Sequence, residues 1–274
     1  MNSGILKTEV VRQEEDRRIP GDDFLAVEEP LEIQLEFGDE SNRRTQSLSI
    51  TMRTPGNDLE LTAGFLLTEG IVKESIDIVE ISHTKTLPGV ESNYILAKLH
   101  PNLQFDMSKL ERHFYTSSSC GVCGKSSIES LRSTLPFSQN HSSSIHIAPE
   151  IIYALPQKLR DAQAAFESTG GIHASGLFDF QGNLLALRED VGRHNALDKL
   201  IGWALMNNKL PLQNCIVLLS GRASFELVQK CAMAGVKIIC AVGAPSSLAV
   251  ESSKDFGINL IGFLRNRRYN IYHP

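Results

Sequence analysis

Two cysteines separated by two residues, Cys120-Gly-Val-Cys123, form the motif whose chemistry is easiest to identify. Gly124 and Lys125 follow, and a helix could begin just after them. A helix N-terminus and a lysine both lower the pKa of a nearby thiol, which increases the fraction of nucleophilic thiolate. We therefore predict an open, glycine-flanked loop that carries out thiol chemistry.

The residues alone leave four interpretations of this pair open. Sulfur or acyl transfer on one thiolate, assisted by the other cysteine, fits an exposed loop best. A zinc site needs about four ligands, and no second close pair of cysteines or histidines follows at zinc-finger spacing. A thioredoxin-like redox pair usually follows a strand, which Phe114-Tyr-Thr116 does not resemble. The fourth possibility is two incidental thiols in a turn.

The other three cysteines have different surroundings. Cys215 and Cys240 lie in apolar, strand-like runs, and Cys231 lies in a predicted helix. Unpaired cysteine is among the most buried residue types, so we predict that all three are core residues.

A second polar motif, Arg188-Glu-Asp-Val-Gly-Arg-His-Asn-Ala-Leu-Asp198, lies where a predicted strand passes into a helix. Asp190 and His194 are four residues apart and would share a helical face. They could bind a metal ion, move a proton or position a cofactor. A helix cap followed by a solvated first turn explains them equally well.

A third motif, Ser220-Gly-Arg-Ala-Ser-Phe-Glu226, follows an apolar strand and opens a helix. Backbone N–H groups at such a junction bind anions, and the Arg222 guanidinium adds a bidentate donor. We predict phosphate or pyrophosphate binding there by Ser220, Gly221, Arg222 and Ser224. The loop Gly243-Ala-Pro-Ser-Ser247 and three arginines after the last apolar run would lie at the same sheet edge.

The elements that carry these motifs fall into two patterns. Alternating apolar residues predict strands at 31–37, 48–52, 76–81 and 94–99, with a helix over 58–66. After a serine-rich stretch, a hairpin at 176–187 and apolar runs at 215–219, 236–242 and 258–264 alternate with helices, which predicts a parallel sheet covered on both faces. The fold class is therefore α/β, with a mostly parallel C-terminal sheet and a smaller N-terminal α+β domain. We place a flexible tail at 1–20, the N-terminal domain at 21–137 with the cysteine loop at 116–126, a linker at 138–144 and the C-terminal domain at 145–274.

Composition narrows the class of protein. The chain has 274 residues, of which 42% are hydrophobic and 22% charged, which is ordinary for a globular protein. A formal net charge of −5 disfavours nucleic acid as a partner. No run reaches about 18 apolar residues, and no secretory leader is evident, so we expect no membrane partner and a cytoplasmic, reducing location.

Taken together, these motifs resemble the formate dehydrogenase accessory sulfurtransferase family (FdhD). The resemblance extends over nearly the whole chain and adds Met52-Arg-Thr-Pro55, Gly64-Phe-Leu-Leu-Thr-Glu-Gly70, Thr169-Gly-Gly-Ile-His173 and Ala244-Pro-Ser-Ser-Leu-Ala249 to the three motifs above. The motif that starts at Arg188 is highly specific, whereas a Cys-x-x-Cys alone is not.

The resemblance implies a sulfurtransferase that receives sulfur from a cysteine desulfurase as a persulfide on Cys120, assisted by Cys123. It passes the sulfur to a molybdenum or tungsten bis(molybdopterin guanine dinucleotide) cofactor before insertion into the catalytic subunit of formate dehydrogenase. Guanine nucleotides would bind at the same site, and the protein would be a homodimer. The implied cofactor-binding stretch consists of Phe263, Leu264, Arg265, Asn266, Arg267 and Arg268.

The family's C-terminal domain is similar in fold to cytidine deaminases. Deaminase chemistry needs a His-x-Glu motif followed by a Pro-Cys-x-x-Cys motif. This chain has His173-Ala-Ser175, and its Cys-x-x-Cys comes before that histidine, so we expect neither the zinc site nor the general acid. Two alternatives to sulfur transfer remain: a non-enzymatic chaperone that binds the molybdenum cofactor, and a zinc-binding protein.

Overall fold

The computed structural model describes residues 4–84, 92–103, 137 and 147–274. The predicted cysteine loop at 116–126 and the predicted linker at 138–144 lie outside these residues.

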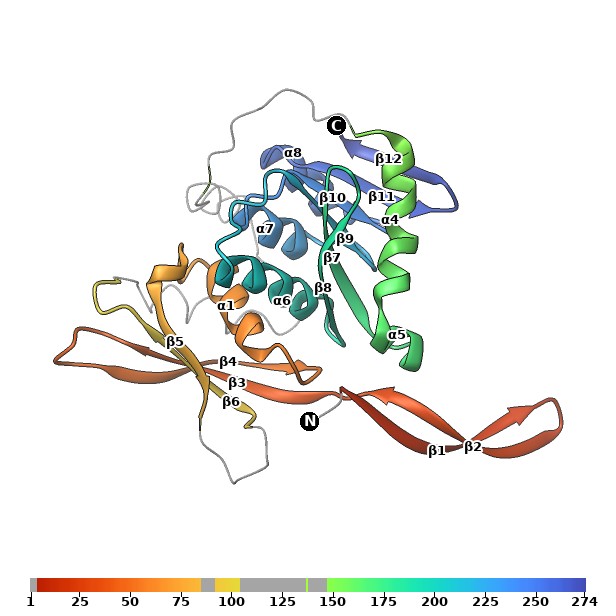
Figure 1. The fold of residues 1–274 in the computed structure, drawn as a ribbon, viewed down its shortest axis with the longest axis horizontal. Coiled ribbons are helices and arrows are strands. Elements are labelled where there is room, and N and C mark those ends of the chain that lie inside the picture. The colour runs from red at the N-terminus through yellow and green to blue at the C-terminus, as the bar shows by residue number, and fades with distance from the viewer. Residues whose placement is uncertain (1–3, 85–91, 104–136, 138–146) are drawn as a thin grey trace.

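The described strands form sheets of two, four and six strands (Figure 1). The two-stranded sheet pairs β1 (Ile5–Glu14) with β2 (Arg17–Ala26). The four-stranded sheet has the order β4-β3-β6-β5 and is made of β3 (Glu29–Phe37), β4 (Arg44–Arg53), β5 (Ile78–His83) and β6 (Tyr94–Leu99). The six-stranded sheet has the order β12-β11-β10-β9-β7-β8 and is made of β7 (His173–Asp179), β8 (Leu184–Asp190), β9 (Cys215–Leu219), β10 (Ile238–Ala241), β11 (Asn259–Arg265) and β12 (Arg268–His273).

The described helices connect or cover these sheets. They are α1 (Asp58–Thr68), the short 3-10 helix η1 (Ser75–Asp77), α4 (Pro149–Ala162), α5 (Ala164–Thr169), α6 (Arg193–Met206), α7 (Phe225–Met233) and α8 (Ser247–Asp255).

The six-stranded sheet is mixed, which corrects the prediction of a mostly parallel sheet. β9, β10 and β11 are parallel because α7 and α8 cross over between them. The pairs β7–β8, β7–β9 and β11–β12 are antiparallel. The β7–β8 hairpin turns at Gln181-Gly-Asn183, as predicted, whereas β12 follows a tight turn at Asn266 and Arg267, both with φ of 53°. The arginine-rich sequence around that turn gave no strand signal.

Helices cover both faces of this sheet, which explains its continuous apolar runs. Along β9, Ile216 and Leu218 pack with α4 on one face, while Val217 and Leu219 pack in the larger cluster on the other. Successive side chains of a strand point to opposite faces, so a strand buried on both sides has no polar alternation.

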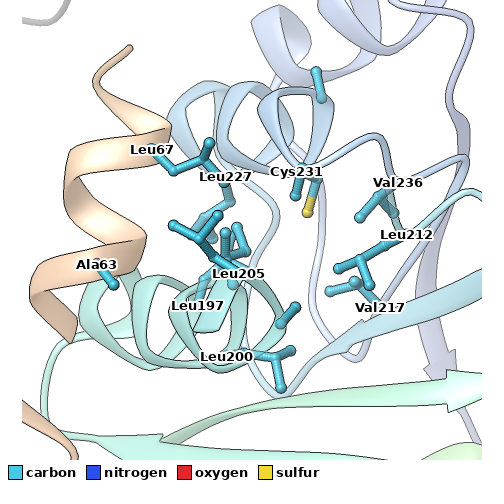
Figure 2. Packing of buried hydrophobic residues seen from close by; sticks show 14 of the residues in the cluster. Ala63, Leu67, Leu197, Leu200, Leu205, Leu212, Val217, Leu227, Cys231 and Val236 are labelled. Atoms are coloured by element: carbon cyan, nitrogen blue, oxygen red, sulfur yellow. The ribbon is translucent and has the colours of Figure 1, made fainter. Parts of the chain in front are cut away.

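The larger cluster also joins the two halves of the chain through α1 and α6. Ala63 and Leu67 of α1 lie beside Leu197 and Leu205 of α6 and Leu227 of α7 (Figure 2).

Two glycines allow this close crossing of α1 and α6. A Cβ on Gly64 would lie 1.8 Å from the carbonyl oxygen of Asp198, and one on Gly202 would lie 1.8 Å from that of Glu60. The two backbones therefore touch at positions where no larger residue fits.

The N-terminal segment forms a hairpin where polar composition predicted a loose tail. β1 and β2 pair in continuous register, and the turn places Glu15 at a φ of 49°. Cross-strand pairs such as Lys7–Asp22, at 2.6 Å, support the ladder. The hairpin extends away from the body of the molecule (Figure 1), so its residues are mostly exposed, including large apolar side chains such as Leu6 and Val11. Among the described helices, none combines the length and apolar character that crossing a membrane requires.

Candidate functional site

Cys120 and Cys123 lie outside the described residues, but the structure fixes the chain on both sides of them. Leu103 packs against the larger core cluster. Phe137 lies against Gly235, where an added Cβ would be 3.1 Å from its ring. The cysteine pair therefore belongs to a stretch tied to the body of the molecule at both ends.

The other three cysteines are core residues, as predicted. Cys231 and Cys240 are completely buried, and Cys215 is partly buried at the start of β9. Burial raises the pKa of all three thiols, that of Cys240 to about 12. They are neutral thiols at physiological pH and poor nucleophiles.

Three loops meet where β9, β10 and β11 end, and we call residues 220–224, 243–246 and 263–268 the strand-end loops. The Gly243 N–H donates to the Gly221 carbonyl at 2.9 Å, and the Phe263 N–H donates to the Gly243 carbonyl at 3.0 Å. A Cβ on Gly243 would lie 3.0 Å from the backbone of Gly221 and Arg222, so a larger residue would push the two loops apart by a few tenths of an ångström. The fold thus brings together segments that the sequence placed at one sheet edge.

Within the first loop, the predicted phosphate-binding residues divide into two kinds. The Ser220 hydroxyl accepts a hydrogen bond from the Ala174 N–H at 2.9 Å, and Gly221 bonds to the neighbouring loop, so both shape the loop. Ser224 is the N-cap residue of α7. The Arg222 side chain is exposed at the helix entrance, where it can contact an anion directly.

In the third loop, the predicted cofactor stretch forms the hairpin between β11 and β12. Leu264 is buried in the smaller core cluster, whereas Arg265, Asn266, Arg267 and Arg268 are exposed. Phe263 has a φ of 53°, an unusual value for a bulky residue, at an irregularity in the β11–β12 pairing. The hairpin thus presents three guanidinium groups at the sheet edge.

Histidines and a carboxylate lie next to the first loop. His194 Nε2 is 3.6 Å from Glu226 Oε2, and this imidazole lowers the pKa of Glu226 to about 2, against the opposing effect of burial. A Cβ on Gly221 would be 3.4 Å from His173 Nδ1. Burial, then the charges of Arg193 and His194, lower the pKa of His173. His173, which the sequence suggested only as a remnant of a deaminase motif, therefore joins the site as a neutral imidazole.

Asp190 does not share a helical face with His194, contrary to the prediction. It ends β8 and is completely buried. Its Oδ2 lies 2.7 Å from Lys199 Nζ and accepts from the Thr54 N–H at 3.1 Å. Its Oδ1 accepts from the Gly192 N–H at 2.8 Å and from Asn195 Nδ2 at 3.1 Å. With four partners inside the protein, this carboxylate has no room for a metal ion or a cofactor.

Asp190 belongs to a buried polar network between the two halves of the chain, which we call the seam. Its members are Thr54, Thr68, Asp190, Asn195, Asp198, Lys199 and Lys230. At its second cluster, Lys230 Nζ lies 2.9 Å from Asp198 Oδ2 and 2.8 Å from Thr68 Oγ1. Sequence reasoning missed the seam, although Lys199 interrupts an apolar helical face next to Leu200 and Ile201.

A hollow of about 440 Å³ is lined by Thr54, by residues of α5 and by residues 187–189 of β8. Its charged groups already have partners: Glu189 accepts from the N–H groups of Ala165 and Phe166, and Arg188 pairs with Glu60. Among the described residues, no group of three or more His, Cys, Asp or Glu side chains is arranged to hold a metal ion.

Comparison with known proteins places the chain in a family. Residues 26–274 match the model of the FdhD/NarQ family. The chain belongs to this family. Proteins named Sulfur carrier protein FdhD are 46% identical in Streptomyces coelicolor, over 91% of this chain and 87% of that protein, and 39% identical in Saccharolobus solfataricus, over 99% and 97%.

A solved structure shares the fold. It is described as a putative formate dehydrogenase accessory protein from Desulfotalea psychrophila, and it superposes with a TM-score of 0.73 at 24% identity over 99% of this chain and 98% of that one.

Proposed function

We propose that this protein is a sulfur carrier that serves formate dehydrogenase, with Cys120 as the carrier residue. Its membership of the FdhD/NarQ family, with relatives named sulfur carrier proteins along nearly its full length, is the observation that carries this proposal. The Cys120-Gly-Val-Cys123 motif supplies the chemistry, because the other three cysteines are neutral thiols, of which Cys231 and Cys240 are completely buried and Cys215 is partly buried.

The loading step needs only a persulfide donor such as a cysteine desulfurase. The Cys120 thiolate attacks the outer sulfur of the donor's persulfide, the donor's S–S bond breaks, and the donor cysteine leaves as a thiolate. The product is a persulfide on Cys120, and no external oxidant is consumed. Cys123 would assist loading or release.

The substrate that takes the sulfur would be the bis(molybdopterin guanine dinucleotide) cofactor. Its phosphates suit the strand-end loops, where Arg222 is exposed just before the N-terminus of α7 and Arg265, Arg267 and Arg268 are exposed in the β11–β12 hairpin. We propose His194 as a further contact and exclude Asp190, because its carboxylate is buried and fully bonded.

Mass spectrometry after incubation with a cysteine desulfurase and cysteine tests the carrier assignment. We expect native protein and the Cys240→Ala control to gain one sulfur on Cys120. The Cys120→Ala variant should gain no sulfur and should no longer support formate dehydrogenase activity. If Cys120→Ala still supports formate dehydrogenase while Arg222→Ala does not, the protein is a non-enzymatic cofactor chaperone. Stoichiometric zinc that disappears in Cys123→Ala would favour a zinc protein.

A further inference from the structure

We infer that Asp190 and Thr54 are positioning residues, which fix the start of α6, and with it Arg193 and His194, beside the strand-end loops. This inference rests on the proposed binding of a guanine-nucleotide cofactor at those loops. It names residues from both halves of the chain that shape the site without touching the ligand.

Two side chains hold the backbone between β8 and α6. The Val191 N–H donates to Thr54 Oγ1 at 3.1 Å, and the Gly192 N–H donates to Asp190 Oδ1 at 2.8 Å. The Gly192 carbonyl then accepts the first helical bond of α6, from the Ala196 N–H at 3.0 Å. Two side chains thus fix consecutive peptide groups immediately before Arg193.

Thr54 is itself held firmly by hydrogen bonds of its backbone. Its N–H donates to Asp190 Oδ2 at 3.1 Å, and its carbonyl accepts from Lys199 Nζ at 2.8 Å. The preceding residue, Arg53, is also buried and bonds to both carboxylate oxygens of Asp58, at 3.1 and 2.9 Å. Thr54 therefore holds the start of α6 from a support that has little freedom of its own.

The segment held in this way places His194 next to the first turn of α7. His194, the second residue of α6, lies 3.6 Å from Glu226 in the first turn of α7, directly after the loop at 220–224. A shift at the start of α6 would separate this pair and widen the site. Displacements of about 1 Å at a binding or catalytic site can cost large factors in function.

The chain offers a matched control at the other cluster of the seam. Asp198 is buried like Asp190 and pairs with Lys230, and Thr68 is buried like Thr54 and donates to Asp198 Oδ1 at 2.9 Å. These residues join the same halves of the chain but bond no backbone group between β8 and α6. A purely structural role would make the two clusters equivalent.

The experiment compares Asp190→Asn and Thr54→Val with Asp198→Asn and Thr68→Val. The measurements are GDP affinity by calorimetry, melting temperature, and the pKa of Glu226 by NMR. We expect GDP to bind at least about tenfold more weakly to Asp190→Asn and about threefold more weakly to Thr54→Val. The pKa of Glu226 should rise in both variants. In the two controls, the GDP affinity and the pKa of Glu226 should stay near their native values, even if the melting temperature falls as much as it does in Asp190→Asn and Thr54→Val. Thr54→Val keeps the test valid if Asp190→Asn does not fold.

Two results would overturn the inference: native GDP affinity and Glu226 pKa in the Asp190 and Thr54 variants, or equal changes in the controls. If native protein binds no GDP, the proposed cofactor site fails instead. The pKa of Glu226 then still decides the positioning role, since it needs no ligand.

Discussion

Polar side chains in the seam and in the strand-end loops differ in how completely the protein itself satisfies them. In the seam, Asp190 has four partners and no exposure, and Lys199 bonds to both Asp190 and the Thr54 carbonyl. In the loops, Arg222 is exposed just before the N-terminus of α7, and the hairpin arginines are exposed around the turn between β11 and β12. Buried polar groups with all partners inside the fold stabilise and orient, whereas exposed cations at such an edge are available to a ligand.

Side chains of the motif that starts at Arg188 have two different roles. Arg188, Asp190, Asn195, Asp198 and Lys199 all bond within the fold, and each has at least one partner in the N-terminal half. His194 instead lies next to Glu226 in the first turn of α7, directly after the first strand-end loop. The motif therefore resembles an active site in its composition, but its side chains mainly join the two halves of the chain.

The largest effect we predict comes from breaking the seam with Lys199→Met. The Asp190 carboxylate would remain buried without its counter-charge, which typically costs about 3–5 kcal/mol. Urea unfolding should show that loss, while Lys209→Met, at an exposed lysine, should leave the free energy of unfolding unchanged. A loss below about 1 kcal/mol in Lys199→Met would mean that the seam does not stabilise the fold.

We expect the next largest loss in the free energy of unfolding from Gly202→Ala, at the crossing of α1 and α6. The new Cβ would lie 1.8 Å from the Glu60 carbonyl oxygen, and since both atoms belong to rigid helices, the helices must separate. We expect a loss of about 3 kcal/mol by the same unfolding measurement. Gly171→Ala, whose Cβ meets only an oxygen at 3.7 Å, is the matched control. Equal stability of the two variants would contradict the close packing.

Arg222→Ala tests whether the exposed arginine of the first strand-end loop binds the ligand. Hydrogen bonds to charged groups contribute about 1.5–3 kcal/mol, so GDP affinity should fall at least about tenfold. The melting temperature should not change, because the side chain is exposed. Arg44→Ala, at an exposed arginine of β4, should bind GDP like the native protein. A fall in melting temperature without a loss of affinity would assign Arg222 to the fold rather than to the ligand.

The smallest effect is a pH dependence of stability from Glu226. Its pKa is about 2 in the folded protein, below its ordinary value of 4.5, so the contribution is complete above pH 4.5 and is lost as the pH falls towards 2. Since the side chain is 48% exposed, we expect less than about 1 kcal/mol. The difference in unfolding free energy between native protein and Glu226→Gln should shrink across that range. A difference that grows on acidification would contradict the pairing with His194.

Local sequence patterns predicted the strands and helices better than they predicted which side chains bond to one another. The alternation of Leu31, Ile33 and Leu35 identified β3, and the apolar run at 215–219 identified β9. The role of Asp190 was not predictable, because its decisive partner, Thr54, lies 136 residues away and carries no charge. β12 and the N-terminal hairpin were missed because their largely exposed strands depend on tight turns rather than on burial.

The most direct test of the account follows sulfur through loading and discharge. Native protein loaded by a desulfurase should carry a persulfide on Cys120 and lose it when the guanine-nucleotide form of the molybdenum cofactor is added, as mass spectrometry of the Cys120 peptide would show. Arg222→Ala should load normally but keep its persulfide. Sulfur that appears on a buried cysteine, or a persulfide that Arg222→Ala discharges at the native rate, would contradict the account.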